Sequence, residues 1–582
     1  MNRLFILLSF IKVVNIRKGG ISMEITEYNK NLAQATATMW NESKSHFGGG
    51  EEVETAQERH ENEWNSGNIV TMLALKEDKV IGYCGLSEYK QDSGALYIPL
   101  LNAHPNYLGI GVGKALVLDA IKRTYKAGWP RLDLYTWPGN MKAVPLYKRC
   151  GFFWEEREET THLMNFIPQV LGHELLKRKA TPANWYPSLK RELAVEPDRE
   201  KNHGFSVYTY TFVTEEETIT VGIEHGGRSI YKIETAAYKI EWLLPDKHLF
   251  ARKDYQAKLV VENKTGDQLH IDAKGTTADK LGITLDLDVD VQGRSEFLLP
   301  FVIKDMEGIT NASEWKTQMI CKVPLLVNGV PCPLACGYAI KEPLKIQTLI
   351  SKKIDHTSEL ALEVSNQQNE AVDVKVELPS SSLMTPMIAS ATIQLKALET
   401  GAVLFPFELK QHGIEQLPLN INLESVGIDS EYETSTPLVI ENDTTLGYFE
   451  QDDHYTSVNG KNQMFYYKES FDILINSNGE RSPWMIRYPT FGEPLNDELG
   501  TKGWETIQFH STKSAIESKM IFSILEGAAL IVANYRWHLN KVEIELFVEN
   551  TSDRMLDLKS IVLPVYFFPD HVYLPTEPAF YL

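Results

Sequence analysis

Residues 107–116 read YLGIGVGKAL, in which glycines 109, 111 and 113 alternate with apolar residues before an amphipathic run begins. The stretch follows a strand-like segment and precedes a helix predicted over 114–126. Glycines at such a turn let backbone N–H groups point into one concavity, and the helix N-terminus adds partial positive charge. The stretch therefore predicts either a pyrophosphate-binding loop or a tight turn that needs glycine for packing.

The residues around this loop alternate between strand and helix patterns. The periodicity predicts a polar helical region over 31–63, a second helix after the loop and a third over 141–149. Apolar runs bounded by turn residues predict strands over 69–75, 80–89, 95–103 and 131–137. This alternation indicates an α/β domain built on an open sheet.

A second motif, NMKAVPLYKRCGF, covers residues 140–152. Its spacing places an asparagine, an alanine, a Leu-Tyr pair and a Gly-Phe pair in fixed order. The two motifs together resemble the GNAT superfamily of N-acetyltransferases, whose signature is Arg/Gln-x-x-Gly-x-Gly/Ala followed by an Asn…Ala…Leu-Tyr…Gly-Phe run. The resemblance covers residues 23–165 and implies the GNAT fold, an open mixed sheet with helices on both faces.

The resemblance also implies a cosubstrate and the residues that hold it. The cosubstrate is acetyl-CoA, with no metal, and the loop signature falls on Leu108 to Gly113. The residues implied to contact the coenzyme are Leu101, Asn102 and Ala103 for the pantetheine arm, Leu108, Gly109, Gly111, Gly113 and Lys114 for the pyrophosphate, and Asn140. Tyr147 resembles the acid that protonates the departing thiolate, because a phenol can donate without carrying charge; a core aromatic is the alternative.

Two departures from the family pattern affect this prediction. The first loop position, usually Arg or Gln, is Leu108, so one side-chain contact to the pyrophosphate is lost while the backbone contacts remain. The strand predicted before the loop holds no carboxylate to deprotonate the acceptor ammonium. The candidates for this base are a water chain, His104, Glu51, Glu52 and Glu54.

The residues after 165 have a different character. Residues 166–204 are basic and mixed and predict a linker with one short helix, and from Phe205 onward short Val-, Ile-, Tyr- and Phe-rich runs predict an all-β region. KLVVENKTGDQLHIDA from Lys258 resembles LALEVSNQQNEAVDVKV from Leu360, a repeat of about 100 residues that suits one sandwich per unit. We therefore expect a β segment at 205–245, immunoglobulin-like β-sandwiches at 246–343 and 344–440, and at 441–582 a β-rich domain, faintly similar to sugar-binding supersandwich domains, whose completeness is left open.

Two functions follow from these parts. In the first, the protein transfers acetyl from acetyl-CoA to the primary amine of a small molecule or protein, and the sandwiches bind substrate or partner or serve assembly. In the second, a degenerate GNAT scaffold accompanies carbohydrate- or protein-binding β domains and catalyses nothing. Clustered aromatics suit either sugar stacking or a β-domain core: Trp484, Tyr488, Phe491, Trp504, Tyr535 and Trp537.

Charge, the N-terminal segment and the cysteines limit the partners and the location that we expect for the protein. The net charge of −20 argues against a nucleic-acid partner, which would need clustered basic residues. Residues 1–22 contain an apolar run too short for a membrane span, and we expect a mis-assigned start, with translation from Met23, or a disordered leader. Five cysteines do not form a disulfide framework, and Cys321, Cys332 and Cys336 suggest buried thiols more than a metal site. Together these features predict a cytoplasmic protein with no membrane partner.

Overall fold

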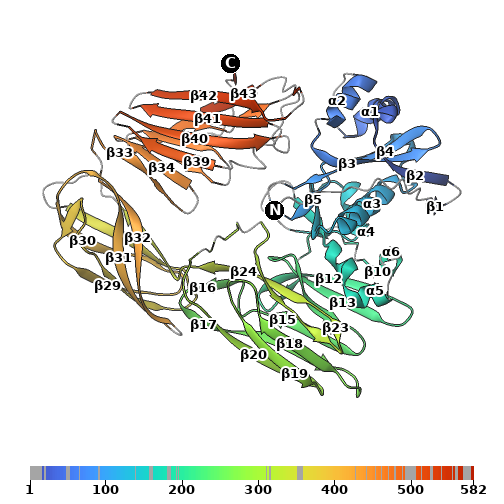
Figure 1. Cartoon of the computed structure of the whole chain (residues 1–582), viewed down its shortest axis with the longest axis horizontal. Coiled ribbons are helices and arrows are strands. Elements are labelled where there is room, and N and C mark those ends of the chain that lie inside the picture. The colour runs from blue at the N-terminus through green and yellow to red at the C-terminus, as the bar shows by residue number, and fades with distance from the viewer. Residues whose placement is uncertain are drawn as a thin grey trace. The chain divides into compact units, whose positions relative to one another are not determined.

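The computed structural model describes residues 16–581 with gaps, of which those longer than three residues are 48–52, 156–161, 180–184, 350–357, 492–505, 525–528, 557–560 and 568–578. The chain divides into two compact units. The first comprises residues 1–250 with 254–341, and the second comprises residues 251–253 with 342–582 (Figure 1). An α/β part opens the first unit, and strands make up the rest of the chain.

The α/β part is built on a nine-stranded mixed sheet of order β1-β2-β3-β4-β5-β7-β9-β8, with β6 paired to β4. Its strands are β1 (Ile16–Lys18), β2 (Ile21–Glu27), β3 (Asn68–Lys76), β4 (Lys79–Glu88), β5 (Ala95–Tyr97), β6 (Leu101–Ala103), β7 (Arg131–Thr136), β8 (Phe153–Trp154) and β9 (His162–Phe166). Its helices are α1 (Ala33–Phe47), α2 (Ala56–Trp64), α3 (Val112–Lys126) and α4 (Ala143–Arg149). Among the helices that the structure describes, none combines the length and apolar content needed to cross a bilayer.

Part of the segment expected to precede the fold belongs to this sheet. Ile16 lies opposite Met23, where β1 pairs with β2. Residues 1–15 lie outside the described residues.

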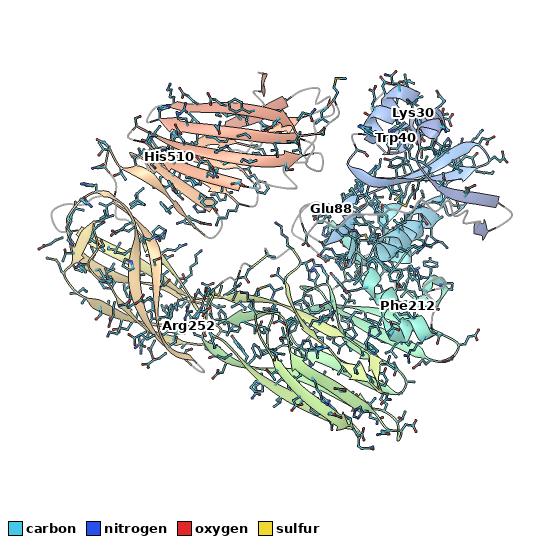
Figure 2. The ribbon with its side chains drawn as sticks, viewed as in Figure 1. Lys30, Trp40, Glu88, Phe212, Arg252 and His510 are labelled. Atoms are coloured by element: carbon cyan, nitrogen blue, oxygen red, sulfur yellow. The ribbon has the colours of Figure 1, made fainter. Side chains whose placement is uncertain are left out.

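Helices cover both faces of the sheet. Adjacent residues of β4 point to opposite faces, so this strand contacts a helix on each side. Tyr83 packs with Met39 and Trp40 of α1 on one face (Figure 2). Gly82 faces α3 on the other, where an added Cβ would lie 2.4 Å from Cγ1 of Val112. The missing side chain at Gly82 therefore lets the first turn of α3 sit directly on β4.

The single strand predicted over 95–103 is wrong in one respect, because the chain forms two strands there. β5 pairs in parallel with β7, and the last bond between them runs from the Ile98 N–H to the Asp133 carbonyl at 2.9 Å. β6 then pairs only with β4, with Leu101 opposite Cys84. The sheet therefore splays open between β6 and β7.

The segment that the sequence suggests is a linker contains several short elements: η3 (Pro168–Gly172), α5 (Glu174–Lys179), α6 (Trp185–Ser188), β10 (Leu189–Lys190) and β11 (Lys201–Asn202). β10 joins a sheet of order β10-β12-β13-β14-β15-β17-β20, with β11 paired to β12. The remaining strands of this sheet are β12 (Phe205–Val213), β13 (Thr218–Glu224), β14 (Ser229–Glu234), β15 (Tyr238–Leu243), β17 (Lys253–Asn263) and β20 (Arg294–Ile303). Residues 205–245 therefore share one sheet with strands of the following segment.

Two smaller sheets complete the first unit. Their strands are β16 (His248–Phe250), β24 (Leu334–Lys341) and β21 (Met319–Val323) in one, and β19 (Thr284–Asp290), β18 (His270–Thr276), β22 (Leu326–Val327) and β23 (Val330–Pro331) in the other. Cys321 lies opposite Cys336 in the β21–β24 pair. All five cysteines of the chain are buried free thiols.

Aromatic rings join the α/β part to the sheet of β12. The ring of Phe153 stacks on Tyr208 at 4.5 Å, and Phe166 packs against Tyr210 at 5.5 Å. The N–H of Ile167 donates to the Tyr210 hydroxyl at 3.1 Å. Phe212, two residues further along β12, is also buried (Figure 2).

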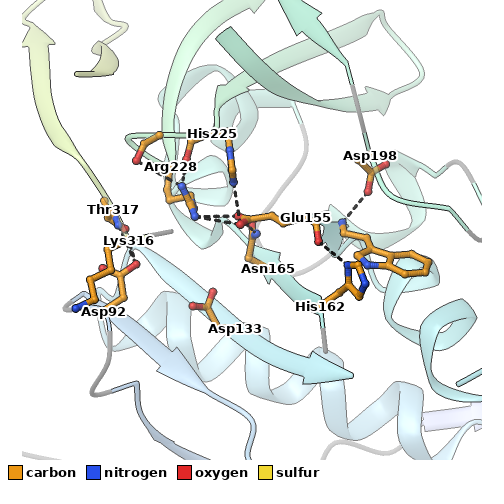
Figure 3. Close-up of polar contacts among 12 residues, drawn as sticks. Asp92, Asp133, Glu155, His162, Asn165, Asp198, His225, Arg228, Lys316 and Thr317 are labelled. Atoms are coloured by element: carbon orange, nitrogen blue, oxygen red, sulfur yellow. Dashed lines mark hydrogen bonds and ion pairs between the residues drawn. The ribbon is translucent and has the colours of Figure 1, made fainter. Parts of the chain in front are cut away.

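A buried carboxylate, Glu155, forms the polar part of the same junction (Figure 3). Its Oε1 lies 3.0 Å from Nη2 of Arg228 and accepts a 2.6 Å bond from Nδ2 of Asn165. Nε2 of His225 lies 2.8 Å from its Oε2. The carboxylate and the guanidinium are each buried in contact with the opposite charge, so removing either leaves a costly unpaired ion.

The second unit contains two packed sheets followed by a further β-rich part. The packed sheets have the orders β25-β26-β30-β28 and β29-β27-β31-β32 and enclose one apolar core. Their strands are β25 (Leu344–Leu349), β26 (Ser358–Asn366), β27 (Val372–Glu377), β28 (Met384–Pro386), β29 (Ser390–Leu395), β30 (Thr400–Leu409), β31 (Gly413–Ser425) and β32 (Ile428–Ile440).

The last part of the chain forms an eight-stranded and a four-stranded sheet. The first has β33 (Leu446–Glu450), β34 (His454–Asn459), β35 (Asn462–Tyr467), β36 (Ile473–Ser477), β37 (Glu480–Ile486), β38 (Thr490–Phe491), β43 (Ile561–Phe567) and β44 (Ala579–Tyr581), and the second has β39 (Thr506–Ser511), β40 (Ala515–Ile524), β41 (Ala529–His538) and β42 (Lys541–Asn550).

The suggestion that Tyr535 and Trp537 stack on a sugar is wrong. Both side chains are buried in an apolar core with Phe522 and Met464, so neither ring presents a face to a ligand. Of the other aromatics suggested, Tyr488 and Trp504 lie outside the described residues, as do the side chains of Trp484 and Phe491.

The two asparagines that are matched in the predicted internal repeat make similar side-chain hydrogen bonds. Nδ2 of Asn263 donates to the carbonyls of residues 267 and 291, and its Oδ1 accepts from the N–H of residue 265. Nδ2 of Asn366 donates to the carbonyls of residues 370 and 396, and its Oδ1 accepts from the N–H of residue 368. Each asparagine therefore closes the same kind of turn in its own domain.

We expect Glu155→Ala to lower the free energy of unfolding of the first unit by about 3 kcal/mol, because Arg228 would be left buried without its carboxylate. Asp288→Ala is the matched control, since it removes an exposed carboxylate that is also ion-paired, to Lys274 at 2.5 Å. Chemical denaturation should show no measurable change for the control. Equal effects of the two substitutions would contradict this account of Glu155.

Candidate active site

The free edge of β6 is the first component of the site. The Gly85 N–H donates to the Leu100 carbonyl at 3.1 Å and the His104 N–H donates to the Ile81 carbonyl at 3.0 Å. Backbone groups along a strand alternate in direction, so the N–H and C=O groups of Leu101 and Ala103 point away from β4. These groups face the splay and are available to an extended ligand.

The glycine loop lies at the end of this edge. After η2 (Pro105–Tyr107), Gly109 and Gly111 adopt positive φ angles of 79° and 98°, a backbone region that L side chains rarely adopt. No heavy atom lies within 4 Å of a Cβ built on either residue. Gly111 also begins α3 without a side-chain cap, so the N–H groups of the first turn lack intrahelical acceptors. The loop thus presents backbone donors to open space.

Packing fixes the position of this loop. A Cβ on Gly113 would lie 3.0 Å from Cδ2 of Leu146 on α4 and 3.8 Å from Cδ2 of Leu101 on β6. The start of α3, the free strand edge and α4 therefore meet at one place. Leu108, at the position where the signature has Arg or Gln, is 51% exposed and supplies no polar group.

Tyr147 lies at the opposite end of the splay from the glycine loop. Its ring is buried on α4, 6.0 Å from the ring of Phe152. Burial raises the pKa of its hydroxyl, and nearby Cys84 and Tyr97 raise it further. Cys84 is the partner of Leu101 and Tyr97 ends β5, so the Tyr147 side chain lies where β6 begins to separate. The phenol therefore stays protonated at neutral pH.

Asn140 has a local structural role in the described chain. Its Oδ1 accepts from the Ala143 N–H at 3.1 Å, and its Nδ2 donates to the Thr136 hydroxyl at 3.3 Å. Asn140 thereby joins the end of β7 to the start of α4. Asn102 is similar, since its side chain is buried and donates to the Ser43 hydroxyl of α1 at 3.0 Å.

Two of the residues predicted as candidates for the general base, His104 and Glu54, are occupied by other contacts. Nε2 of His104 lies 2.6 Å from a carboxylate oxygen of Glu42, and its Nδ1 accepts from the Asn106 N–H at 3.1 Å, so neither nitrogen has a free lone pair. Glu54 is held by Asn62 at 2.6 Å and Arg59 at 3.5 Å. Glu51 and Glu52 lie outside the described residues. These contacts argue against His104 and Glu54 as bases.

Comparison of the sequence with models of known protein families points to the family that its motifs resemble. Residues 35–152 match the model of the acetyltransferase (GNAT) family. The chain contains a GNAT domain. A search of curated protein sequences gives no significant match.

Solved structures resemble the chain over one region of similar size. PaiA N-acetyltransferase from Thermoplasma acidophilum, solved in complex with coenzyme A, is 19% identical and covers 25% of this chain and 99% of its own, with a TM-score of 0.22. Ribosomal-protein-alanine N-acetyltransferase from Brucella melitensis is 17% identical, with coverage of 25% and 98% and a TM-score of 0.21. A GNAT-family acetyltransferase from Streptococcus pneumoniae is 22% identical, with coverage of 25% and 98% and a TM-score of 0.22.

Sequence reasoning missed a group of tyrosines at the splay of the GNAT domain. The hydroxyls of Tyr89 and Tyr135 lie 2.7 Å apart, and the ring of Tyr97 lies 5.4 Å from Tyr89 and 6.2 Å from Tyr135. Burial raises the pKa of Tyr97 to about 12. The three residues belong to no motif, and Tyr135 lies far along the chain from the other two, so the sheet register brings them together beside Tyr147.

A buried ion cluster holds the sheet of the GNAT domain where the splay begins. Nη2 of Arg131 lies 2.6 Å from Oδ2 of Asp92 and 2.7 Å from Oδ2 of Asp133. Thr317, from the β-rich part of the first unit, donates its N–H and hydroxyl to the same Asp92 oxygen at 2.9 and 3.0 Å (Figure 3). Burial raises the pKa of Asp133 to about 6, against the opposing effect of Arg131. Two carboxylates therefore share one guanidinium.

The raised pKa of Asp133 predicts a pH effect on stability. An unfolded aspartate has a pKa of about 4, so between about pH 4 and 6 only the folded chain holds this proton, and stability falls as the pH rises through that range. Asp133→Asn removes this dependence. We expect the stability of the wild type relative to Asp133→Asn to decrease from pH 4.5 to 6 and then level off. A difference in unfolding free energy between the wild type and Asp133→Asn that stays constant at every pH would contradict this assignment.

Proposed function

We propose that the GNAT domain transfers the acetyl group of acetyl-CoA directly to a primary amine. The observation that carries the proposal is the splay, in which a free strand edge joins a glycine loop at one end and a buried phenol at the other. The pantetheine arm would pair with Leu101 and Ala103, and the pyrophosphate would accept from the amides of Gly109, Gly111, Gly113 and Lys114. Asn140 would hold the coenzyme indirectly, through the start of α4.

The chemistry of this step needs few groups from the protein. The amine nitrogen attacks the thioester carbonyl, the new C–N bond forms, and the C–S bond breaks as the tetrahedral intermediate collapses. The ammonium proton would leave through water before the attack, and the neutral phenol of Tyr147 would donate to the departing sulfur, which becomes a thiol. The second proton lost from the nitrogen would then return to the Tyr147 oxygen through water and restore the phenol. Neither a covalent enzyme intermediate nor a dedicated carboxylate base is required.

The acceptor would approach through the tyrosine group of residues 89, 97 and 135. Aromatic faces attract ammonium groups, so these rings suit an amine that arrives protonated. The test is incubation of the whole protein with acetyl-CoA and a panel of primary amines, with thiol release and amide mass as readouts. Binding of acetyl-CoA without release to any amine would favour a non-catalytic coenzyme-binding protein.

Gly111→Trp should weaken binding of acetyl-CoA by more than tenfold, about 1.4 kcal/mol, because the indole would fill the space that the pyrophosphate needs. Gly128→Trp is the matched control: this glycine also has a positive φ and open space, at the other end of α3. Isothermal titration compares the two. Unchanged affinity for Gly111→Trp would refute the loop assignment.

Tyr147→Phe should lower kcat about 100-fold and leave the affinity for acetyl-CoA nearly unchanged, because it removes only the proton donor. Tyr125→Phe, at the far end of α3, serves as control. Steady-state kinetics with the best amine of the panel separates kcat from KM. Full activity of Tyr147→Phe would make this residue part of the packing only.

A further inference from the structure

Three basic side chains gather around Tyr186, outside the segment that matches the GNAT family. Nζ of Lys114, in the first turn of α3, lies 4.8 Å from the centre of the Tyr186 ring. The guanidinium carbon of Arg191 lies 4.1 Å from the same centre, and its Nη1 donates to the Tyr186 carbonyl at 2.9 Å. Tyr186 belongs to α6 and Arg191 directly follows β10, so both come from the segment after residue 152.

Arg149, the last residue of α4, belongs to the same cluster. Lys114, Arg191 and Arg149 all act on the buried thiol of Cys150, where each opposes the rise in pKa that burial causes. Arg191 and Arg149 likewise oppose the raised pKa of Tyr186. Lys114 and Arg191 therefore meet at the Tyr186 ring, and Arg149 adds a third, exposed positive charge at the end of α4.

These charges lack the carboxylate partners that several other cations of the domain have. Within the described residues, no carboxylate oxygen lies within ion-pair distance of Lys114, Arg149 or Arg191, whereas Lys148 on the same helix lies 3.2 Å from Asp198. The chain as a whole has a net charge of −20. Three cations held together without a counter-ion repel each other, and a bound anion would relieve that repulsion.

The cluster lies close to the glycine loop. Lys114 directly follows Gly113, which contacts Leu146 of α4, and α4 spans only about 10 Å from end to end. Arg191 also lines a cavity of about 600 Å³ that residues of α4 and β12 border. Coenzyme A carries a 3′-phosphate one ribose away from its pyrophosphate, and arginine and lysine are the usual partners of such a phosphate.

We propose that Lys114, Arg149 and Arg191, positioned by Tyr186, bind the 3′-phosphate of the coenzyme, so that a segment outside the GNAT fold completes the coenzyme site. This inference rests on the proposed function. It makes the protein selective for coenzyme A over 3′-dephospho-coenzyme A. Tyr186 is a positioning residue, because its ring packs against both Lys114 and Arg191 and its carbonyl accepts from Arg191.

The test is isothermal titration of the full chain with coenzyme A and with 3′-dephospho-coenzyme A. We expect the wild type to bind coenzyme A at least about tenfold more tightly, the size of one charge-assisted hydrogen bond. Arg191→Ala should lose most of this preference by weakening coenzyme A alone. Lys190→Ala, an exposed neighbouring cation outside the cluster, is the matched control and should keep the preference.

The outcomes separate this inference from the proposed function. Equal affinity of the wild type for the two ligands would overturn the 3′-phosphate subsite and leave acetyl transfer standing. Equal weakening of both ligands by Arg191→Ala would do the same, since it would show a structural role at the end of α4. Lys114→Gln provides a second variant for the selectivity measurement. Binding of neither ligand to the wild type would overturn both proposals.

Discussion

The separation of β6 from β7 is the constraint on which the candidate site depends. An ordinary strand over 95–103 would hydrogen-bond on both sides and leave no room for a ligand. Here the last bond to β7 is made by Ile98, and the chain then turns to β4 alone. Two side-chain contacts to α1, from Asn102 and His104, hold β6 in this separated position. The unpaired edge is therefore built into the fold.

Polar contacts in the interior support the same region. A buried ion pair restricts the positions of the strands that carry it, because its hydrogen bonds require a fixed geometry. Arg131, Asp92 and Asp133 fix β7 at the start of the splay, and Glu155 with Arg228 fixes the next strands against the sheet of β12. The β-rich part of the first unit thus contributes directly to the shape of the acetyltransferase sheet.

The sequence predicted much of this domain because its signals are local. Helix periodicity, the glycine loop and the Leu-Tyr…Gly-Phe run each lie within a few turns of chain, and they located α3, α4 and the loop correctly. The break in the strand at 98–100 was missed although Pro99 lies in it and has no N–H to donate to a neighbouring strand. Which strand each half then pairs with depends on the sheet register, which the sequence does not show. The tyrosine group and the partners of Glu155 were missed for a similar reason, since they depend on sheet register.

The repeat shows that a sequence pattern can match equivalent positions about 100 residues apart in the chain. Asn263 and Asn366 were matched by pattern. Each side chain accepts from the N–H two residues on and donates to the carbonyl four residues on, and each also donates to a carbonyl of a distant strand connection, 28 residues on for Asn263 and 30 for Asn366. For the aromatic residues of the last domain, no comparable hydrogen-bond pattern in the sequence indicates the role of the side chain. A tyrosine or tryptophan serves a core as readily as a binding surface, and Tyr535 and Trp537 serve the core.

The contact between Asp92 and Thr317 has a consequence for synthesis on the ribosome. The two residues are 225 positions apart. At about 5–20 residues per second, Thr317 emerges roughly 10–45 s after Asp92. Throughout that interval the nascent GNAT sheet carries a charged cluster that lacks its final hydrogen-bond donor. Completion of the GNAT sheet is therefore coupled to translation of the β-rich segment that follows it.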